Sequence, residues 1–181
     1  MENKLKRVKR ELVYAGSILD IYADYMELPN GKVEKWDFVS HRKGAAAVVP
    51  VLDDGKILLV KQFRFALNRM TLEIPAGSRD SVEEDTLICA KRELEEETGY
   101  TSKDFKKLIS LKTTVAFCDE MIDVYLARNL IVGEQKLDEA EDIEIKAFEL
   151  SELIQMIFSG KLQDSKTVAG ILAYQALVLS K

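Results

Sequence analysis

The sequence predicts a single globular domain of the α/β class, more specifically α+β, from three observations. Strand-like segments separated by turn residues fill the chain from residue 12 to residue 63, and a helical segment with an acidic flank follows. The last stretch, residues 150–180, has the periodicity of two helices. At 181 residues the chain is long enough for one substantial core and too short for two ordinary domains.

The strand-like segments divide into an N-terminal layer and the start of a core sheet. Residues 12–41 predict antiparallel strands around a turn at 29–31, and the basic residues at positions 4–10 are interpreted as a solvated start. Residues 45–63 are strongly apolar around Asp54-Gly55 and predict a hairpin that is covered on both faces. Further strand-like segments follow at 107–117, 121–130 and 144–150.

The helical segment is expected to begin near Ser81 and to end at Gly99. Ser81 and Glu84 have the spacing of a capping box, and Gly99 is suited to a left-handed C-cap. Apolar side chains at helical spacing would face the core, and three glutamates would lie on an adjoining flank. The core positions are Leu87, Ala90 and Leu94, and the glutamates are Glu93, Glu96 and Glu97.

The acidic flank belongs to the segment RELEEETG, residues 92–99. Glutamates three or four positions apart on a helix repel each other by roughly 0.2 to 0.5 kcal/mol per pair, so a nearby cation would relieve them. Clustered carboxylate oxygens suit Mg²⁺ or Mn²⁺, and the neighbouring Arg92 is a fixed cation that can orient a carboxylate. An ordinary solvated helix face is the alternative interpretation.

Composition excludes several function classes. A net charge of −5 gives no electrostatic footprint for nucleic acid, and no apolar run has the length of a membrane span or of a signal peptide core. The sequence therefore predicts a cytoplasmic protein without a nucleic-acid or membrane partner. Cys89 and Cys118 fit no metal spacing and are expected to be free thiols. Because His41 is the only histidine, the chemistry must depend on carboxylates.

Residues 77–100, GSRDSVEEDTLICAKRELEEETGY, resemble the Nudix box, in which Gly, five residues, Glu and seven residues precede Arg-Glu-aliphatic-any-Glu-Glu-any-Gly-aliphatic. The second half matches position by position, and the seven-residue gap leads back to Glu84. Ser78 then occupies the formal glycine position, so Gly77 comes one residue early and indicates an insertion in the preceding loop. Tyr100 replaces the final aliphatic residue.

Segments outside the box resemble the ADP-ribose pyrophosphatase branch of the Nudix hydrolase family. They are residues 28–64, LEIPAG at 72–77, TVAFCDEMIDVYLA at 114–127, DEAEDIEI at 138–145 and GKLQDSKTVAGIL at 160–172. The resemblance implies a mixed sheet sandwiched between helices, with an N-terminal antiparallel sheet exchanged across a homodimer. It also implies two parts of one unit: a dimerisation layer at 1–43 and a Nudix hydrolase domain at 44–181.

The activity implied by this resemblance is Mg²⁺-dependent hydrolysis of ADP-ribose to AMP and ribose 5-phosphate, with Mn²⁺ as a possible replacement. A related alternative is hydrolysis of another nucleoside diphosphate sugar, such as GDP-mannose. A non-catalytic ligand sensor with the same fold is a further alternative, which the intact Arg92, Glu93, Glu96 and Glu97 disfavour.

The resemblance also implies roles for individual residues. The metal ligands would be Glu93, Glu97, Glu96, the carbonyl of Ala76 and Glu141, with Arg92 orienting the carboxylates and Glu84 supporting them. The catalytic residues would be Glu139, Arg92 and Glu97, with Glu139 as the base. Asp138, Asp142 and Glu144 leave the register of this acidic loop open, and a solvated loop is the alternative.

Substrate contacts are expected from residues in three further segments. Trp36 aligns with an aromatic residue that stacks on adenine, with Asp37 beside it, although a lone tryptophan is more often a core residue. In an exchanged dimer Trp36 would serve the partner's site. Arg64 matches a phosphate-contacting arginine, with a surface salt bridge as the alternative. Glu73 either contacts substrate or is structural, and Glu120 is a weaker supporting candidate.

Overall fold

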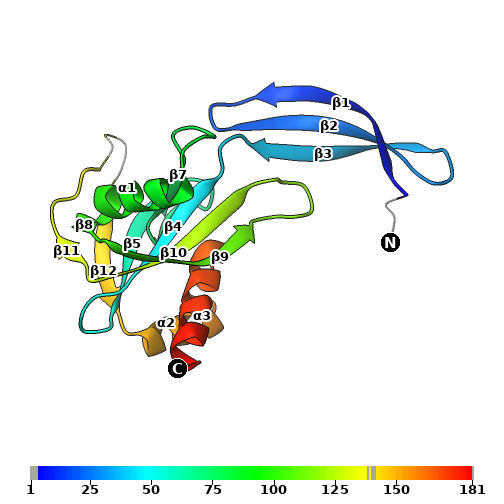
Figure 1. Ribbon diagram of the computed structural model, residues 1–181. Coiled ribbons are helices and arrows are strands. Elements are labelled where there is room, and N and C mark those ends of the chain that lie inside the picture. The colour runs from blue at the N-terminus through cyan, green and yellow to red at the C-terminus, as the bar shows by residue number, and fades with distance from the viewer. Residues whose placement is uncertain (1–3, 138, 140–141, 181) are drawn as a thin grey trace.

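The N-terminal part of the chain forms a separate antiparallel sheet that projects from the rest of the molecule (Figure 1). The computed structural model describes residues 4–137, 139 and 142–180. Strands β1 (Lys6–Ala15), β2 (Leu19–Glu27) and β3 (Val33–His41) lie in that order in this sheet. We call this sheet the arm. Most side chains of β1 are exposed, as expected of a solvated start, but the strand begins at Lys6 and not near residue 12.

The body of the molecule contains a mixed four-stranded sheet in the order β7-β4-β10-β9. Its strands are β7 (Ala76–Ser78), β4 (Ala45–Pro50), β10 (Met121–Arg128) and β9 (Asp104–Lys112). Strands β4 and β10 are parallel, and the other neighbours are antiparallel. A three-stranded sheet, β12-β5-β6, and a short β11-β8 pair complete the body. Their strands are β12 (Glu144–Phe148), β5 (Ile57–Arg64), β6 (Arg69–Glu73), β11 (Ile131–Val132) and β8 (Tyr100–Thr101).

The predicted hairpin between residues 45–52 and 56–63 is wrong, because the two strands belong to different sheets. Strand β4 pairs with β10 and β7, whereas β5 pairs with β12 and β6. A single bridge between Val51 and Ile57 remains beside the turn. Each of the two strands is apolar enough to be buried in a sheet of its own. Strands that are distant in the sequence therefore pair with them, in place of the hairpin partner that is adjacent in the sequence.

The mixed sheet lies between helices, as predicted. Alternate residues of β4 face opposite sides: Ala46 and Val48 pack against α1 (Thr86–Thr98), while Ala47 and Val49 pack toward the C-terminal helices. Helices α2 (Leu150–Phe158) and α3 (Ser165–Leu179) cover that second side (Figure 1). Among the described residues, no helix combines the length and apolar character that crossing a membrane requires.

Helix α1 begins later than the capping-box pattern predicted. Its N-cap is Asp85, whose side chain accepts a hydrogen bond of 2.7 Å from the Leu87 amide. Ser81 Oγ instead accepts from the amides of Glu83 and Glu84, at 3.2 Å each, and so stabilises a turn before the helix. The predicted C-cap is confirmed, because Gly99 has a φ of 71° in the left-handed region.

Candidate active site

A cavity of about 330 Å³ lies between α1, β7 and the segment that follows β11. It brings together six residues that were predicted as metal-binding, orienting or phosphate-binding: Arg64, Ala76, Arg92, Glu93, Glu96 and Glu97. Its remaining lining residues are Gln62, Gly77, Ser78, Asp80 and Lys136. The acidic flank of α1 is therefore the wall of a cavity and not a plain solvated face.

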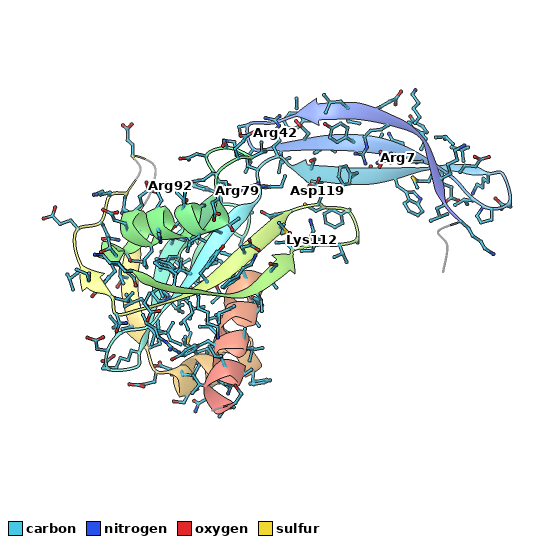
Figure 2. The ribbon with its side chains drawn as sticks, viewed as in Figure 1. Arg7, Arg42, Arg79, Arg92, Lys112 and Asp119 are labelled. Carbon is cyan, nitrogen blue, oxygen red and sulfur yellow. The ribbon has the colours of Figure 1, made fainter. Side chains whose placement is uncertain are left out.

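Arg92, which Figure 2 labels beside α1, fixes the orientation of two carboxylates in this cavity. Its Nη1 donates to Glu93 at 2.7 Å and to Glu96 at 2.9 Å, and its Nη2 donates to the Ser78 carbonyl at 3.0 Å. Glu84 lies 3.5 Å from Nε. Burial alone would lower the pKa of Arg92, but Glu93 and Glu96 outweigh it and raise that pKa. Arg92 is therefore a permanent cation that also ties α1 to β7.

Glu93 and Glu97 lie one helical turn apart and point toward β7. Both are buried, with exposed fractions of 8% and 4%. The Ala76 amide donates to Glu97 Oε2 at 2.9 Å, and Gly77 lies so close to the Glu93 carboxylate that an added Cβ would overlap it. Strand β7 is thus close-packed against the two carboxylates.

Helix α1 is held over the sheet by a buried carboxylate at its opposite end. Asp123 on β10 accepts hydrogen bonds from Thr86, Ser110 and Lys107 at 2.6 to 2.8 Å. Thr86 is the first residue of α1. Since Asp123 is only 5% exposed, this contact fixes where the helix begins, and hence where Glu93 and Glu97 lie about two to three turns later.

The segment that carries the predicted base is docked onto the C-terminal end of α1. Gln135 Nε2 donates to the Glu97 carbonyl at 2.6 Å, and the Lys136 amide donates to the Glu96 carbonyl at 2.9 Å. These carbonyls have no partner within a helix, so the segment caps them. Glu139 is exposed and lies three residues beyond Lys136, which lines the cavity. Asp138 and Glu141 lie outside the described residues.

Residues 41–170 match the family model described as the NUDIX domain. The chain belongs to the NUDIX domain family. It is 43% identical over 168 residues to an ADP-ribose pyrophosphatase of Bacillus subtilis, covering 92% of this chain and 90% of that protein. It is 39% identical, with the same coverage, to a methanol dehydrogenase activator of Bacillus methanolicus. A crystal structure of an ADP compounds hydrolase has the same fold, with a TM-score of 0.88, 18% identity, and coverage of 98% and 96%.

The donor set of the Nudix helix fits a hard divalent cation. The side chains of Glu93, Glu96 and Glu97 and the backbone of Ala76 offer only oxygen ligands, which Mg²⁺ and Mn²⁺ prefer. Within residues 4–137, 139 and 142–180, no three Asp, Glu, His or Cys side chains converge as a complete metal site. Arg92 binds Glu93 and Glu96 in this arrangement, so its guanidinium holds carboxylate oxygens that a metal would share.

The structure assigns a physical role to the early glycine of the box. The position that cannot hold a side chain is Gly77, because of the Glu93 carboxylate, whereas Ser78 contributes its carbonyl to Arg92. We expect Gly77→Ala to displace Glu93 and weaken divalent-metal binding about tenfold or more. Calorimetric titration with Mn²⁺ checks this. Ser78→Ala keeps the carbonyl and is the matched control; equal affinity in both variants would contradict the steric role of Gly77.

Glu73 lies at the bottom of the neighbouring β5–β6 hairpin, where it is only 3% exposed. It accepts two hydrogen bonds of 2.7 Å from Arg64, one of 2.7 Å from Thr71 and one of 2.5 Å from Lys166. All four usual acceptor positions of the carboxylate are therefore occupied by protein donors. These contacts match the structural alternative for Glu73. They also orient Arg64, whose Nη1 makes no hydrogen bond within the described part of the chain.

The ion pairs of Glu73 predict a loss of stability in acid. Burial alone would raise its pKa, but Arg64 and Lys166 lower the pKa from 4.5 to about 2. A carboxylate whose pKa is lower in the folded than in the unfolded protein stabilises the fold when the pH is above its unfolded-state pKa. The contribution of Glu73 to stability is therefore complete above pH 4.5 and is lost as the pH falls toward 2. We expect Glu73→Gln to lower the free energy of unfolding at pH 7 by about 3 kcal/mol.

Urea unfolding of Glu73→Gln and the unchanged protein at several pH values measures this effect. The difference between the two proteins should shrink as the pH falls below 4.5. The exposed Glu83, changed to glutamine, is the control for loss of a carboxylate as such. A constant difference at every pH would contradict the assignment.

Trp36, Asp37 and Glu120 lie away from the cavity within one chain. Trp36 and Asp37 are on β3 in the arm, and Trp36 is 43% exposed. Glu120 accepts a hydrogen bond of 2.7 Å from Thr113 and lies 3.5 Å from His41. His41 Nδ1 accepts a hydrogen bond of 3.1 Å from the Gly44 amide.

Four cavity residues were not identified from the sequence as site residues: Gln62, Ser78, Asp80 and Lys136. The Ser78 carbonyl accepts a hydrogen bond from Arg92. Gln62 lies within residues 28–64, and Lys136 lies two residues before the acidic segment 138–145; the sequence singled out both segments. The position of each residue in or beside such a segment was the available signal. Asp80 lies 3.6 Å from Arg92 Nε and had no distinguishing pattern.

Proposed function

We propose that this protein hydrolyses the pyrophosphate bond of ADP-ribose to give AMP and ribose 5-phosphate. The observation that carries the proposal is the cavity in which Arg92 holds the Nudix glutamates against β7. The 43% identity to a relative named ADP-ribose pyrophosphatase, over most of both chains, supports the choice of substrate. Both cysteines are free thiols, as in proteins of a reducing compartment, which supports the cytoplasmic location included in the proposal.

Glu93, Glu97 and the Ala76 carbonyl are the proposed holders of Mg²⁺, or of Mn²⁺ in its place, with Glu96 and Glu141 as further ligands. When bound, the cation would supply the positive charge that neutralises the pyrophosphate oxygens. Arg92 keeps the carboxylates oriented while a metal takes their oxygens. Arg64 contributes a second fixed cation, since Glu73 holds its Nε and Nη2 and leaves Nη1 to contact a phosphate.

Glu139 is the proposed general base. The docking of Lys136 onto the end of α1 supports this assignment, because Lys136 lines the cavity and Glu139 is three residues further on, a stretch that spans at most about 10 Å. The carboxylate would accept a proton from the water that attacks phosphorus in line with the leaving oxygen.

The proposal includes a homodimer in which the arm of one protomer completes the partner's site. The arm exposes large apolar side chains that a monomer leaves uncovered, among them Val13 at 61%, Tyr14 at 57% and Trp36 at 43%. Trp36 would stack on the substrate base in the partner's site. Domain exchange of this kind would cover the apolar surface of the arm. It would also bring Trp36 to the cavity of the partner, although Trp36 is distant from the cavity of its own chain.

Mixed dimers test this arrangement. We expect Trp36→Ala to raise KM about tenfold, corresponding to a stacking contribution of about 1 to 3 kcal/mol, and Glu97→Gln to be inactive. Refolding the two variants together should then restore activity at low substrate concentration, because the mixed dimer contains one site with both Trp36 and Glu97. If mixed dimers form but activity is not restored, Trp36 acts in the site of its own protomer or in no site.

A substrate panel tests the function itself. The protein is incubated with Mg²⁺ and ADP-ribose, GDP-mannose or other nucleoside diphosphate sugars, and the products are separated by chromatography. We expect AMP and ribose 5-phosphate from ADP-ribose at the highest kcat/KM. A preference for GDP-mannose would overturn the substrate assignment. Absence of cleavage across the panel would overturn the enzyme assignment and favour a role like that of the relative named as a dehydrogenase activator.

A further inference from the structure

A second and larger cavity, of about 820 Å³, lies along β6 at the edge of its sheet. Its walls are the β5–β6 hairpin, β12 and the segment between α2 and α3. Arg64 lines both this cavity and the smaller one that contains the Nudix glutamates. The volume is within the range of about 300 to 1,000 Å³ that is typical of small-molecule sites.

Some of the charges around the larger cavity balance each other. Arg64 and Lys166 both bind Glu73, and Lys166 also lies 3.0 Å from Asp164. These two cations and two carboxylates form one group without net charge. Glu73 and Asp164 are also the only acidic residues in the described lining.

Arg69 and Lys161 are cations of the opposing walls that are not balanced in this way. Arg69 is the direct cross-strand neighbour of Arg64, and of these two arginines only Arg64 is paired with Glu73. Its Nη2 donates to the amide oxygen of Gln163 at 2.6 Å, which joins the hairpin to the α2–α3 segment. Within the described residues, neither Arg69 nor Lys161 forms an ion pair with a carboxylate.

Apolar side chains lie beside these cations. Leu67 and Met70 on the hairpin are 57% and 45% exposed, and Leu72 and Phe148 form the inner wall. A ligand that is only a phosphate would contact the cations and not the apolar side chains. An apolar ligand would leave the cations without a partner. A ligand that combines a phosphate with a flat organic group satisfies both parts of the surface.

We propose that the larger cavity binds a phosphomonoester carried on a flat organic group, the chemical class of the nucleoside monophosphates. Arg69 and Lys161 bind the phosphate, and the organic group packs on Leu67 and Met70. Arg64 lines both cavities, so the bound ligand would lie beside this arginine. This inference does not depend on the proposed hydrolysis.

Calorimetric titration of AMP, ribose 5-phosphate and inorganic phosphate onto the full chain in EDTA tests the proposal. EDTA removes divalent metal, so that phosphate binding supported by the Nudix glutamates is suppressed. We expect AMP to bind more tightly than the other two probes, because only AMP has a flat group for the apolar wall. We expect the double variant Arg69→Gln/Lys161→Gln to bind AMP about tenfold more weakly or worse.

The matched control is Lys103→Gln/Lys106→Gln, which removes the same net charge from exposed positions that line neither cavity. Its AMP affinity should equal that of the unchanged protein. Circular dichroism verifies that both variants are folded. The proposal is overturned by equal weakening in both double variants, by no weakening in Arg69→Gln/Lys161→Gln, by equal affinity for the three probes, or by absence of AMP binding.

Discussion

Changing Glu97 to glutamine should reduce kcat/KM for ADP-ribose on the order of 1,000-fold. The substitution keeps the size of the side chain and its hydrogen bond with the Ala76 amide can persist, but it removes one negative charge from the metal-binding wall. Several kcal/mol of charge stabilisation in the transition state depend on that charge through the bound cation. Steady-state kinetics with Mg²⁺ measure the loss, and calorimetry with Mn²⁺ measures the accompanying fall in metal affinity.

Glu95 provides a matched control on the same helix. It lies two positions before Glu97, is absent from the cavity lining and pairs with Lys136 at 2.5 Å on the surface. A pair of this kind is worth about 0 to 1 kcal/mol, so Glu95→Gln should change kcat/KM by about fivefold or less. If the two variants lost activity equally, the total negative charge of the helix would matter and not the position of Glu97.

Changing Glu139 to glutamine should lower kcat about 100-fold to 10,000-fold while KM changes little. Loss of a general base removes an interaction that exists only in the transition state, whereas the groups proposed to bind substrate and metal remain in place. Steady-state kinetics with Mg²⁺ measure both kcat and KM.

The acidic loop contains its own controls for the position of the base. Asp142 lies three residues further along, and Glu144 is on β12, where it pairs with Lys61 at 3.2 Å. Asp142→Asn and Glu144→Gln should keep their kcat within a few-fold of the unchanged protein. Near-normal turnover of Glu139→Gln, together with a large loss in one of the other two, would move the base to that residue.

The core face of α1 was predictable because it depends on local periodicity. Ala90 and Leu94 are fully buried, as the helical spacing predicted, and Gly99 ends the helix in the left-handed conformation. The start of the helix was less predictable. Ser81 had capping-box spacing, but Asp85 caps the helix, since both residue types accept amide hydrogen bonds and the intervening turn uses Ser81.

Strand pairing was not predictable from the same local information. Residues 45–52 and 56–63 flank a turn and have the composition of a hairpin, yet β4 pairs in parallel with β10. A parallel partner must come from a distant part of the chain, and its register depends on burial on both faces of the sheet. Continuous apolar runs carry no signal that distinguishes the near partner from the distant one.

The sequence by itself determined the residue types and spacings that chemistry requires: the Nudix glutamates, Arg92 at their start, and the helix that presents them on one flank. These are properties of a single helical segment, and neighbours along a helix are set by its period. Only the tertiary structure decided what those glutamates face. It placed Gly77 against Glu93 and docked Gln135 and Lys136 on the end of α1. It also filled the acceptor positions of the Glu73 carboxylate with hydrogen bonds from protein donors. Such contacts join segments far apart in the chain, so they depend on packing and not on local pattern.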